Sequence, residues 1–396
     1  MKIVLPGGTL GVIGGGQLGR MFALEAKRMA YNVVVLSPEE DCPAGQVADL
    51  QIRGDYEDQK ALRRFADAID VATIEFENIP VGTLEQIEKE VPVRPGPDAL
   101  RIAQNRQHEK TFLSDHGFPV TPFRSIGCQD DIDAVLETEL PAVLKTSSSG
   151  YDGKGQRMVN SQEQLIAAWK ELGAVECVLE SFVDFDCEFS VIVARNESQV
   201  THYAPIRNEH RNHILDISSS PANLSQQAAE GAIEVATGIA EATKYVGVMC
   251  VEFFLCRDDK VLVNEIAPRP HNSGHLTIEA HETNQFEQQV RAVCNLPLGS
   301  TTQHRPAAMA NLLGDLWSGG TPAWQQALSA SGTTLHLYGK DTPRVGRKMG
   351  HLTCIGATVE SAVETAQQAR KDCGTGCGAG EPAEGSKGSG TETLAH

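Results

Sequence analysis

The N-terminal part of the chain alternates short apolar runs with amphipathic stretches. The run at 9–16 ends in the pattern Gly14-x-Gly16-x-x-Gly19, and apolar positions then recur at helical spacing. Further apolar runs lie at 32–36 and 71–78, and the amphipathic stretch 57–68 separates them. Because strands that alternate with helices favour a parallel sheet, we predict a Rossmann-like α/β domain over residues 1–106.

The middle of the chain predicts α+β structure over residues 107–300. A helix begins at Gln107, and Gly117-Phe118-Pro119 ends it. A small subdomain is expected at about 120–183, with strands at 141–145, 156–159 and 175–180 and a helix at 161–171. A larger unit follows, with strands at 187–194 and 200–206, a helix at 225–245 and a hairpin at 248–266.

The last part of the chain changes in composition. Residues 301–373 predict a small C-terminal domain, and residues 374–396 are rich in Gly, Ser, Glu and Thr with few large apolar side chains. A segment of that composition cannot bury enough apolar surface to fold, so we expect the tail to be disordered.

Charge and composition narrow the function classes. The chain is 41% hydrophobic, and it has no apolar run long enough to cross a bilayer or to serve as a signal peptide, which favours a cytoplasmic protein. Its formal net charge of −18 argues against nucleic acid and anionic membranes as partners. The ten cysteines show no paired metal-ligand spacing and are expected to be reduced thiols. Any bound anion must therefore be held by individual Lys and Arg side chains.

The segment 141–156 is the best candidate for a phosphate site. An apolar strand ends at Lys145, and a loop of Ser and Gly follows that carries a second lysine, Lys154. Exposed backbone N–H groups beside lysines suit a polyphosphate such as ATP. The P-loop pattern is absent, so we predict a glycine flap between two strands. A flexible surface hairpin without a ligand is the alternative.

The glycine pattern at 14–19 is weaker evidence. A nicotinamide site would need an acidic residue at the end of the second strand, where Ser37-Pro38 stands instead. Gln17 and Leu18 open the following helix, whose N-terminus suits another phosphorylated ligand. A tight turn that binds nothing is the alternative.

Two carboxylates are expected to face each other on the hairpin. If Asp258-Asp259 forms a two-residue turn, Glu252 lies opposite Glu265. Opposed carboxylates repel, and a divalent cation such as Mg²⁺ would compensate them. Two solvated glutamates are the alternative, because a slip of one residue would separate the pair.

A basic cluster lies among glycines near the C-terminal end. Lys340, Arg347 and Lys348 fall within nine positions of an acidic chain. Cations concentrated in this way suit a substrate phosphate, and a solvated surface loop is the alternative.

These motifs together resemble the ATP-grasp superfamily, and within it the N5-carboxyaminoimidazole ribonucleotide synthetases. The matching segments are Gly14–Gly19, Thr73–Asn78, Ser149–Gln156, Val263–His275 and Tyr338–Lys340, which run in family order over most of the chain. The resemblance implies an ATP-grasp fold preceded by a Rossmann-like domain and followed by a small C-terminal domain, a homodimer, and a ligase that uses ATP, Mg²⁺ and bicarbonate to carboxylate aminoimidazole ribonucleotide. Formate-dependent glycinamide ribonucleotide transformylase is the closest alternative, and its flap lacks the insertion Tyr151-Asp152-Gly153.

The resemblance also implies roles for single residues. ATP contacts are expected from Arg106, Lys145, Gly150, Tyr151, Asp152, Gly153, Lys154, Gly155, Gln156, Glu180, Ser181, Phe182, Val183, Glu188, His210, Asn264 and Glu265. Substrate contacts are expected from Gln17, Leu18, Glu75, Tyr151, Asp152, His271, Asn272, Ser273, His275, Lys340, Arg347 and Lys348. Catalytic roles fall to Asp152, Lys154, Arg269 and Lys340, and metal binding to Glu252 and Glu265. In the His210 loop, His213 replaces a glycine of the family, which puts that loop's shape in doubt.

Overall fold

A parallel sheet forms the N-terminal part of the protein, as the alternation of runs predicted. The computed structural model describes residues 3–148 and 155–374. The sheet has the order β3 (Leu50–Arg53), β2 (Asn32–Ser37), β1 (Thr9–Ile13) and β4 (Val71–Ile74). The associated helices are α1 (Gln17–Arg28), α2 (Gln59–Asp67), α3 (Val81–Ile87) and α4 (Pro97–Ala103). Strand β3 was not predicted, because it is a short edge strand with only Ile52 fully buried.

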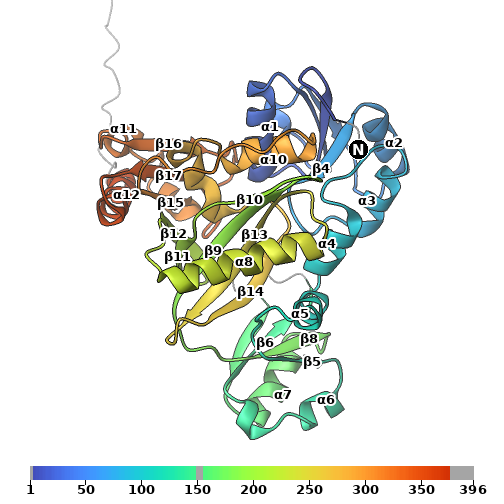
Figure 1. Ribbon diagram of the computed structural model, residues 1–396, viewed down its shortest axis with the longest axis vertical. Coiled ribbons are helices and arrows are strands. Elements are labelled where there is room, and N and C mark those ends of the chain that lie inside the picture. The colour runs from blue at the N-terminus through green and yellow to red at the C-terminus, as the bar shows by residue number, and fades with distance from the viewer. Residues whose placement is uncertain (1–2, 149–154, 375–396) are drawn as a thin grey trace, which may run out of the picture.

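The small subdomain is a four-stranded sheet with two helices beside it. Its strands are ordered β5 (Phe123–Ile126), β8 (Cys177–Ser181), β6 (Ala142–Thr146) and β7 (Gln156–Val159). Helices α6 (Gln129–Asp133) and α7 (Gln162–Glu171) belong to it, and α5 (Arg106–Asp115) leads into it. Figure 1 shows this subdomain at one end of the molecule, away from the N- and C-terminal parts.

A nine-stranded sheet forms the centre of the molecule. Its order is β14 (Val261–Ala267), β13 (Gly247–Cys256), β9 (Phe185–Arg195), β11 (Ile206–Arg211), β12 (Ile214–Ser220), β15 (Ala307–Leu313), β17 (Lys348–Ile355) and β16 (Thr333–Leu337), and β10 (Val200–His202) pairs with β9. The strands β15, β16 and β17 from the C-terminal part therefore continue the sheet that β9 to β14 form. The remaining helices are α8 (Gln226–Ala242), α9 (Thr277–Ala280), α10 (Gln285–Val293), α11 (Trp324–Ala327) and α12 (Val359–Gly374).

Helix α10 joins the N-terminal part to the centre. It contacts α1, β4, β9 and β13. Its Phe286, Val290 and Val293 share one core cluster with Phe22 of α1 and Leu10 of β1. Figure 1 shows α10 beside α1. Within the described ranges, every helix is too short or too polar to cross a membrane.

Candidate active site

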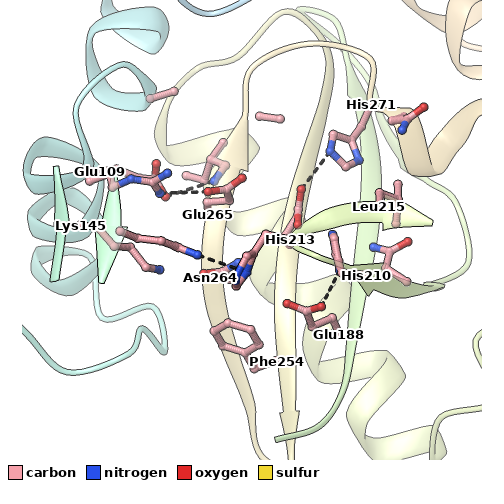
Figure 2. A pocket seen from close by; sticks show the side chains of 18 of the residues that line it. Glu109, Lys145, Glu188, His210, His213, Leu215, Phe254, Asn264, Glu265 and His271 are labelled. Atoms are coloured by element: carbon pink, nitrogen blue, oxygen red, sulfur yellow. Dashed lines mark hydrogen bonds and ion pairs between the residues drawn. The ribbon is translucent and has the colours of Figure 1, made fainter. Parts of the chain in front are cut away.

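A cavity of about 1020 Å³ lies where the small subdomain, the central sheet and the N-terminal part meet. Figure 2 shows Lys145 reaching from β6 toward Asn264 and Glu265 of β14, with Glu188 and His210 on the other side. The residues predicted from the sequence that line the cavity are Arg106, Lys145, Gln156, Glu188, His210, Glu252, Asn264, Glu265, Arg269, His271, Asn272 and Lys348. One hollow thus brings together residues from segments more than 200 positions apart.

The two carboxylates predicted to oppose each other do so, because Glu252 pairs with Glu265. The predicted two-residue turn is nevertheless wrong. The Cys256 N–H donates to the Lys260 carbonyl oxygen over 2.8 Å, so the three residues 257–259 form the turn. A bulge then shifts the register by one residue and restores the pairing of the glutamates.

The bulge lies at Asn264 and decides which side chains share a face. Val263 packs with Phe253 in the core beneath the sheet, and Val261 lies against the same core. Regular alternation along β14 would place these valines on the face of Glu265, but the extra residue of the bulge reverses the alternation. As a result, both Asn264 and Glu265 line the cavity.

Each of the two carboxylates has a cationic side chain as its partner. Arg106 Nη1 donates to Glu265 over 3.0 Å, and His271 Nε2 lies 2.9 Å from Glu252. Burial opposes charge on Glu252 and His271, yet their neighbours prevail: His271 lowers the pKa of Glu252 to about 2, and Cys250 together with Glu252 raises the pKa of His271. Side chains of the protein thus reduce the repulsion between the two glutamates.

The donor set also fits Mg²⁺. The buried Oδ1 atom of Asn264 has no hydrogen-bond partner among the described residues, and Asn264 forms the bulge directly beside the Glu252–Glu265 pair. Within the described ranges, no group of three His, Cys, Asp or Glu side chains is placed to form a complete metal cage. Two carboxylates and an amide oxygen suit an ion that takes its other ligands from phosphates and water.

A buried acidic side chain lies at the end of the cavity that the small subdomain forms. Lys145 donates to Glu180 Oε2 over 3.0 Å. Burial would raise the pKa of Glu180, but Lys110 and Lys145 outweigh it and lower the pKa to about 2. Glu180 is buried behind the cavity wall, and the exposed Phe182 and its neighbours Ser181 and Val183 follow it out of β8. Their contact with adenine stays a prediction.

The loop after β11 tolerates the histidine that replaces a glycine. Asn212 and His213 have positive φ angles of 50° and 63°, the left-handed region in which glycine is favoured. The ring of His213 lies 3.4 Å from the amide of Gln156, at the start of β7. His210 Nδ1 lies 2.5 Å from Glu188 Oε2, and this carboxylate outweighs burial and raises the pKa of His210.

At the opposite end of the cavity, Glu77 of the N-terminal part binds the guanidinium group of Arg269, which follows β14. Arg269 donates to both oxygens of Glu77, with Nε at 2.5 Å and Nη2 at 3.0 Å. Burial opposes the charge of Glu77, but Arg269 prevails and lowers its pKa. A bidentate pair of this kind fixes the guanidinium plane toward the cavity. Glu77 was not singled out from the sequence, although it lies two positions after the predicted Glu75.

The N-terminus of α1 is filled by the protein itself. Glu75 accepts a hydrogen bond from Gly16 N over 2.7 Å and another from Gly19 N over 3.3 Å. A Cβ at Gly16 would lie 2.6 Å from Glu75 Oε1, so this turn needs glycine for the approach of a carboxyl group. A phosphate held there beside Gln17 and Leu18 would compete with this carboxyl group for the same N–H groups, and its binding at the helix end stays a prediction.

The basic cluster lies against the N-terminal part. Gln46 donates to the Gly339 carbonyl over 3.0 Å, and Lys340 Nζ donates to the Lys348 carbonyl over 2.8 Å. Burial lowers the pKa of Lys340 to about 8, and neighbouring Arg347 adds to the effect. Of this cluster, Lys348 lines the cavity.

Two of the predicted substrate contacts lie in the interior. Ser273 hydrogen-bonds to the Ser190 hydroxyl, and His275 accepts a contact from Gln285 and stacks on His351. Both are fully buried and do not line the cavity. This placement fits a role in holding His271 and Asn272 better than the direct contact expected. The flap residues Gly150, Tyr151, Asp152, Gly153 and Lys154 lie outside the described residues.

Comparisons with known proteins cover three stretches of the chain. Residues 8–104 match the ribonucleotide synthetase preATP-grasp domain, 111–286 the ATP-grasp domain, and 307–365 the phosphoribosylaminoimidazole carboxylase C-terminal domain. N5-carboxyaminoimidazole ribonucleotide synthase of Bacillus subtilis is 42% identical over 357 residues, which are 89% of this chain and 92% of the relative. The chain belongs to the N5-carboxyaminoimidazole ribonucleotide synthase family.

Solved structures of this family agree in fold. The ADP complex of an N5-carboxyaminoimidazole ribonucleotide synthetase matches with a TM-score of 0.89 and 42% identity, over 93% of this chain and 98% of the other. The Aspergillus clavatus N5-carboxyaminoimidazole synthase in complex with ADP and 5-aminoimidazole ribonucleotide matches with a TM-score of 0.83 and 32% identity, over 92% and 98%. The expected ATP-grasp fold with a preceding Rossmann-like domain and a C-terminal domain is thereby confirmed.

Proposed function

We propose that the protein uses ATP and bicarbonate to carboxylate 5-aminoimidazole ribonucleotide to N5-carboxyaminoimidazole ribonucleotide, in purine biosynthesis. The observation that carries this function is the two-ended cavity. Opposed carboxylates lie between a nucleotide end with Lys145 and an end with Arg269 and Lys348. Its relatives are named for this synthase activity.

Glu252, Glu265 and Asn264 would hold Mg²⁺, and Arg106 and Lys145 would hold the phosphates of ATP. When bound, the ion supplies positive charge at the phosphate oxygens. The protein's own contribution is position and charge: Arg106 already lies 3.0 Å from Glu265, and Lys145 extends from β6 into the same cavity. Such groups stabilise the charge on a phosphoryl group in transfer.

Bicarbonate would bind beside Arg269, whose guanidinium Glu77 keeps in place. A bicarbonate oxygen attacks the γ-phosphorus of ATP, and the bond to the β-phosphate oxygen breaks, which leaves carboxyphosphate and ADP. Positioning of the two anions by fixed cations is the main source of acceleration here.

The exocyclic amine of the imidazole then attacks the carboxyl carbon, or the CO₂ released from carboxyphosphate. The bond to phosphate breaks, and the amine loses a proton to a base. Asp152 is the candidate base from the sequence, with Tyr151 and Lys154 beside it. The 5′-phosphate of the nucleotide would bind Lys340, Arg347 and Lys348.

A substrate-dependence assay tests this function. ADP formation is measured with bicarbonate or with formate, in the presence of aminoimidazole ribonucleotide or glycinamide ribonucleotide. We expect stimulation by aminoimidazole ribonucleotide with bicarbonate. Stimulation only by formate and glycinamide ribonucleotide would instead identify the transformylase activity.

The assembly and location of the protein belong to the same proposal. A homodimer is expected from the family resemblance, and mass measurement in solution would establish it. A cytoplasmic location stays a prediction from the sequence.

A further inference from the structure

A lysine that the proposed function does not use is buried next to the nucleotide end of the cavity. The side chain of Lys110, on α5, is 1% exposed. Its Nζ atom lies 3.3 Å from Glu180 Oε2 and donates to the Asn264 carbonyl oxygen over 2.9 Å. Lys110 is not among the residues that line the cavity. Lys110 therefore does not contact a ligand in the cavity. Burial of a charged group is unfavourable unless that group is paired, so its partners need to be identified.

The same oxygen, Glu180 Oε2, also forms an ion pair with Lys145, which lies at the cavity wall. Lys145 Nζ lies 3.0 Å from Glu180 Oε2, and Lys145 lines the cavity. One buried oxygen thus has two ammonium partners, one in the interior and one within reach of a ligand. The other oxygen, Oε1, has no hydrogen-bond partner among the described residues.

The other charged side chains near Lys110 do not replace Glu180 as its partner. Glu109 is buried beside Lys110, but its Oε1 accepts a hydrogen bond from the Ile266 N–H over 3.1 Å, whereas Lys110 and Lys145 both form their ion pairs with Glu180. Arg106, the first residue of α5, pairs with Glu265 instead. Glu180 is therefore the anion for both lysines. If Lys145 were its only cation, Lys145 could not turn to a phosphate without leaving a buried carboxylate unpaired, which is strongly unfavourable.

We propose that Lys110 is a positioning residue of the nucleotide site: it keeps Glu180 compensated from the interior and thereby leaves Lys145 available for the phosphates of ATP. This inference rests on the proposed ATP site, and it adds a residue for which no role was predicted. Lys110 acts through Glu180 and Lys145 and does not touch the nucleotide.

The test compares two ligands that differ only in phosphates. Dissociation constants of ATP, with Mg²⁺, and of adenosine are measured by calorimetry for the full chain and for Lys110→Met. We expect ATP to bind at least about tenfold more weakly to the variant, the effect of one lost charge-assisted contact. Adenosine should bind with nearly unchanged affinity, because Lys145 then stays with Glu180 and only the phosphate contact is lost.

A second substitution should restore what the first removes. In Lys110→Met combined with Glu180→Gln, no buried carboxylate needs compensation, so Lys145 is free again. The ratio of ATP to adenosine affinity should then return to within about threefold of wild type, whatever Glu180 itself contributes to binding of the adenosine moiety. If the Met variant fails to fold, Lys110→Gln carries the test, since it keeps a donor for Glu180 but no charge. Arg94→Met is the matched control, because Arg94 is also a buried cation bonded to a backbone carbonyl, that of Val293, away from the cavity.

The outcomes separate the possibilities. Equal weakening of ATP and adenosine, or no weakening of either, would overturn the inference, as would a double variant no better than the single one. A wild-type protein that binds no ATP would overturn the proposed function together with this inference. Wild-type ATP binding with an unaffected Lys110→Met variant would overturn the inference alone.

Discussion

Lys340 shows how one buried side chain can make substrate binding depend on pH. Its ammonium group lies near Arg347 and Lys348, and burial lowers its pKa from 10.5 to about 8. Below pH 8 the group is charged and can pair with a phosphate, and above pH 8 it is increasingly neutral. An exposed lysine differs in this respect, because it stays charged to about pH 10.

We therefore predict that the KM for aminoimidazole ribonucleotide rises between about pH 7.5 and 9, by up to about tenfold per unit above the pKa. Lys340→Arg should remove the rise, because a guanidinium stays charged throughout this range. Steady-state kinetics at saturating ATP would measure it. The same rise in Lys340→Arg would show that another group is responsible.

Glu75 and Glu77 illustrate what the sequence could reveal at the scale of residues. Both lie inside the predicted apolar run 71–78 and directly after the observed strand β4, so their position at the end of a strand could be predicted. Their partners were not, because Gly16 and Arg269 lie 59 and 192 positions away. The signal that could have indicated the contact between Glu75 and the turn is the glycine pattern itself. A strand-to-helix turn without Cβ atoms leaves room for a carboxyl group as well as for a phosphate. The roles assigned to the site residues stay predictions.

At the scale of elements, the hairpin β13–β14 pairs Glu252 with Glu265 as predicted, although the predicted two-residue turn was wrong. A longer turn and a bulge each shift the register by one residue, and the two shifts cancel at Glu252 and Glu265. The sequence signals neither the longer turn nor the bulge. Asp259 adopts a positive φ in the turn without being a glycine, and Asn264 does not interrupt the strand pattern in a way that marks a bulge.

The bulge gives a prediction about metal dependence. Asn264→Ala removes the unpartnered Oδ1 but leaves the backbone and both glutamates, so the Mg²⁺ concentration that half-activates ADP formation should rise about tenfold, as for other lost metal-site partners. Titration of activity with Mg²⁺ at fixed ATP measures this value. Asn160→Ala, an exposed change outside the cavity, is the control. An unchanged midpoint in Asn264→Ala would contradict a role for this oxygen.

Strands β11 and β12 were not resolved from the sequence for a related reason. Their polar side chains pack against one another: Asn208 donates to Ser190 over 3.1 Å, and Ser218 donates to Asn208 over 2.9 Å. A buried network of this kind satisfies its polar groups in the interior and leaves no apolar run for a pattern to detect. In contrast, strands with apolar runs such as β1, β2 and β9 were predicted close to their observed limits.

At the scale of the whole molecule, α10 makes the N-terminal and central parts one cooperative structure. The ring of Phe286 is fully buried in a cluster with Phe22 and Leu10. The domain limits 1–106, 107–300 and 301–373 stay a prediction, and the central sheet continues without a break from β14 to β16. Sequence reasoning identified the units but not this continuity, because strand order depends on contacts between distant segments.

We predict that Phe286→Ala lowers the free energy of unfolding by about 3–5 kcal/mol, the usual effect of truncating a buried aromatic side chain. Denaturant unfolding followed by tryptophan fluorescence and by far-UV circular dichroism should give one coincident transition at a lower midpoint. Leu136→Ala, at an exposed side chain, should change little. Two separated transitions in the wild type would mean that the parts unfold independently.

The carboxyl group at the start of α1 has a consequence for ligand choice. Glu75 is tethered to the chain and stands at the helix end permanently, at an effective concentration that corresponds to millimolar or more for a free ion. A dinucleotide or inorganic phosphate in solution would have to displace this internal competitor. The turn Gly14–Gly19 therefore has the backbone shape of a cofactor site, but the side chain of Glu75 takes the position that a ligand would occupy. An anion from solution could therefore reach the N–H groups of Gly16 and Gly19 only by displacing Glu75.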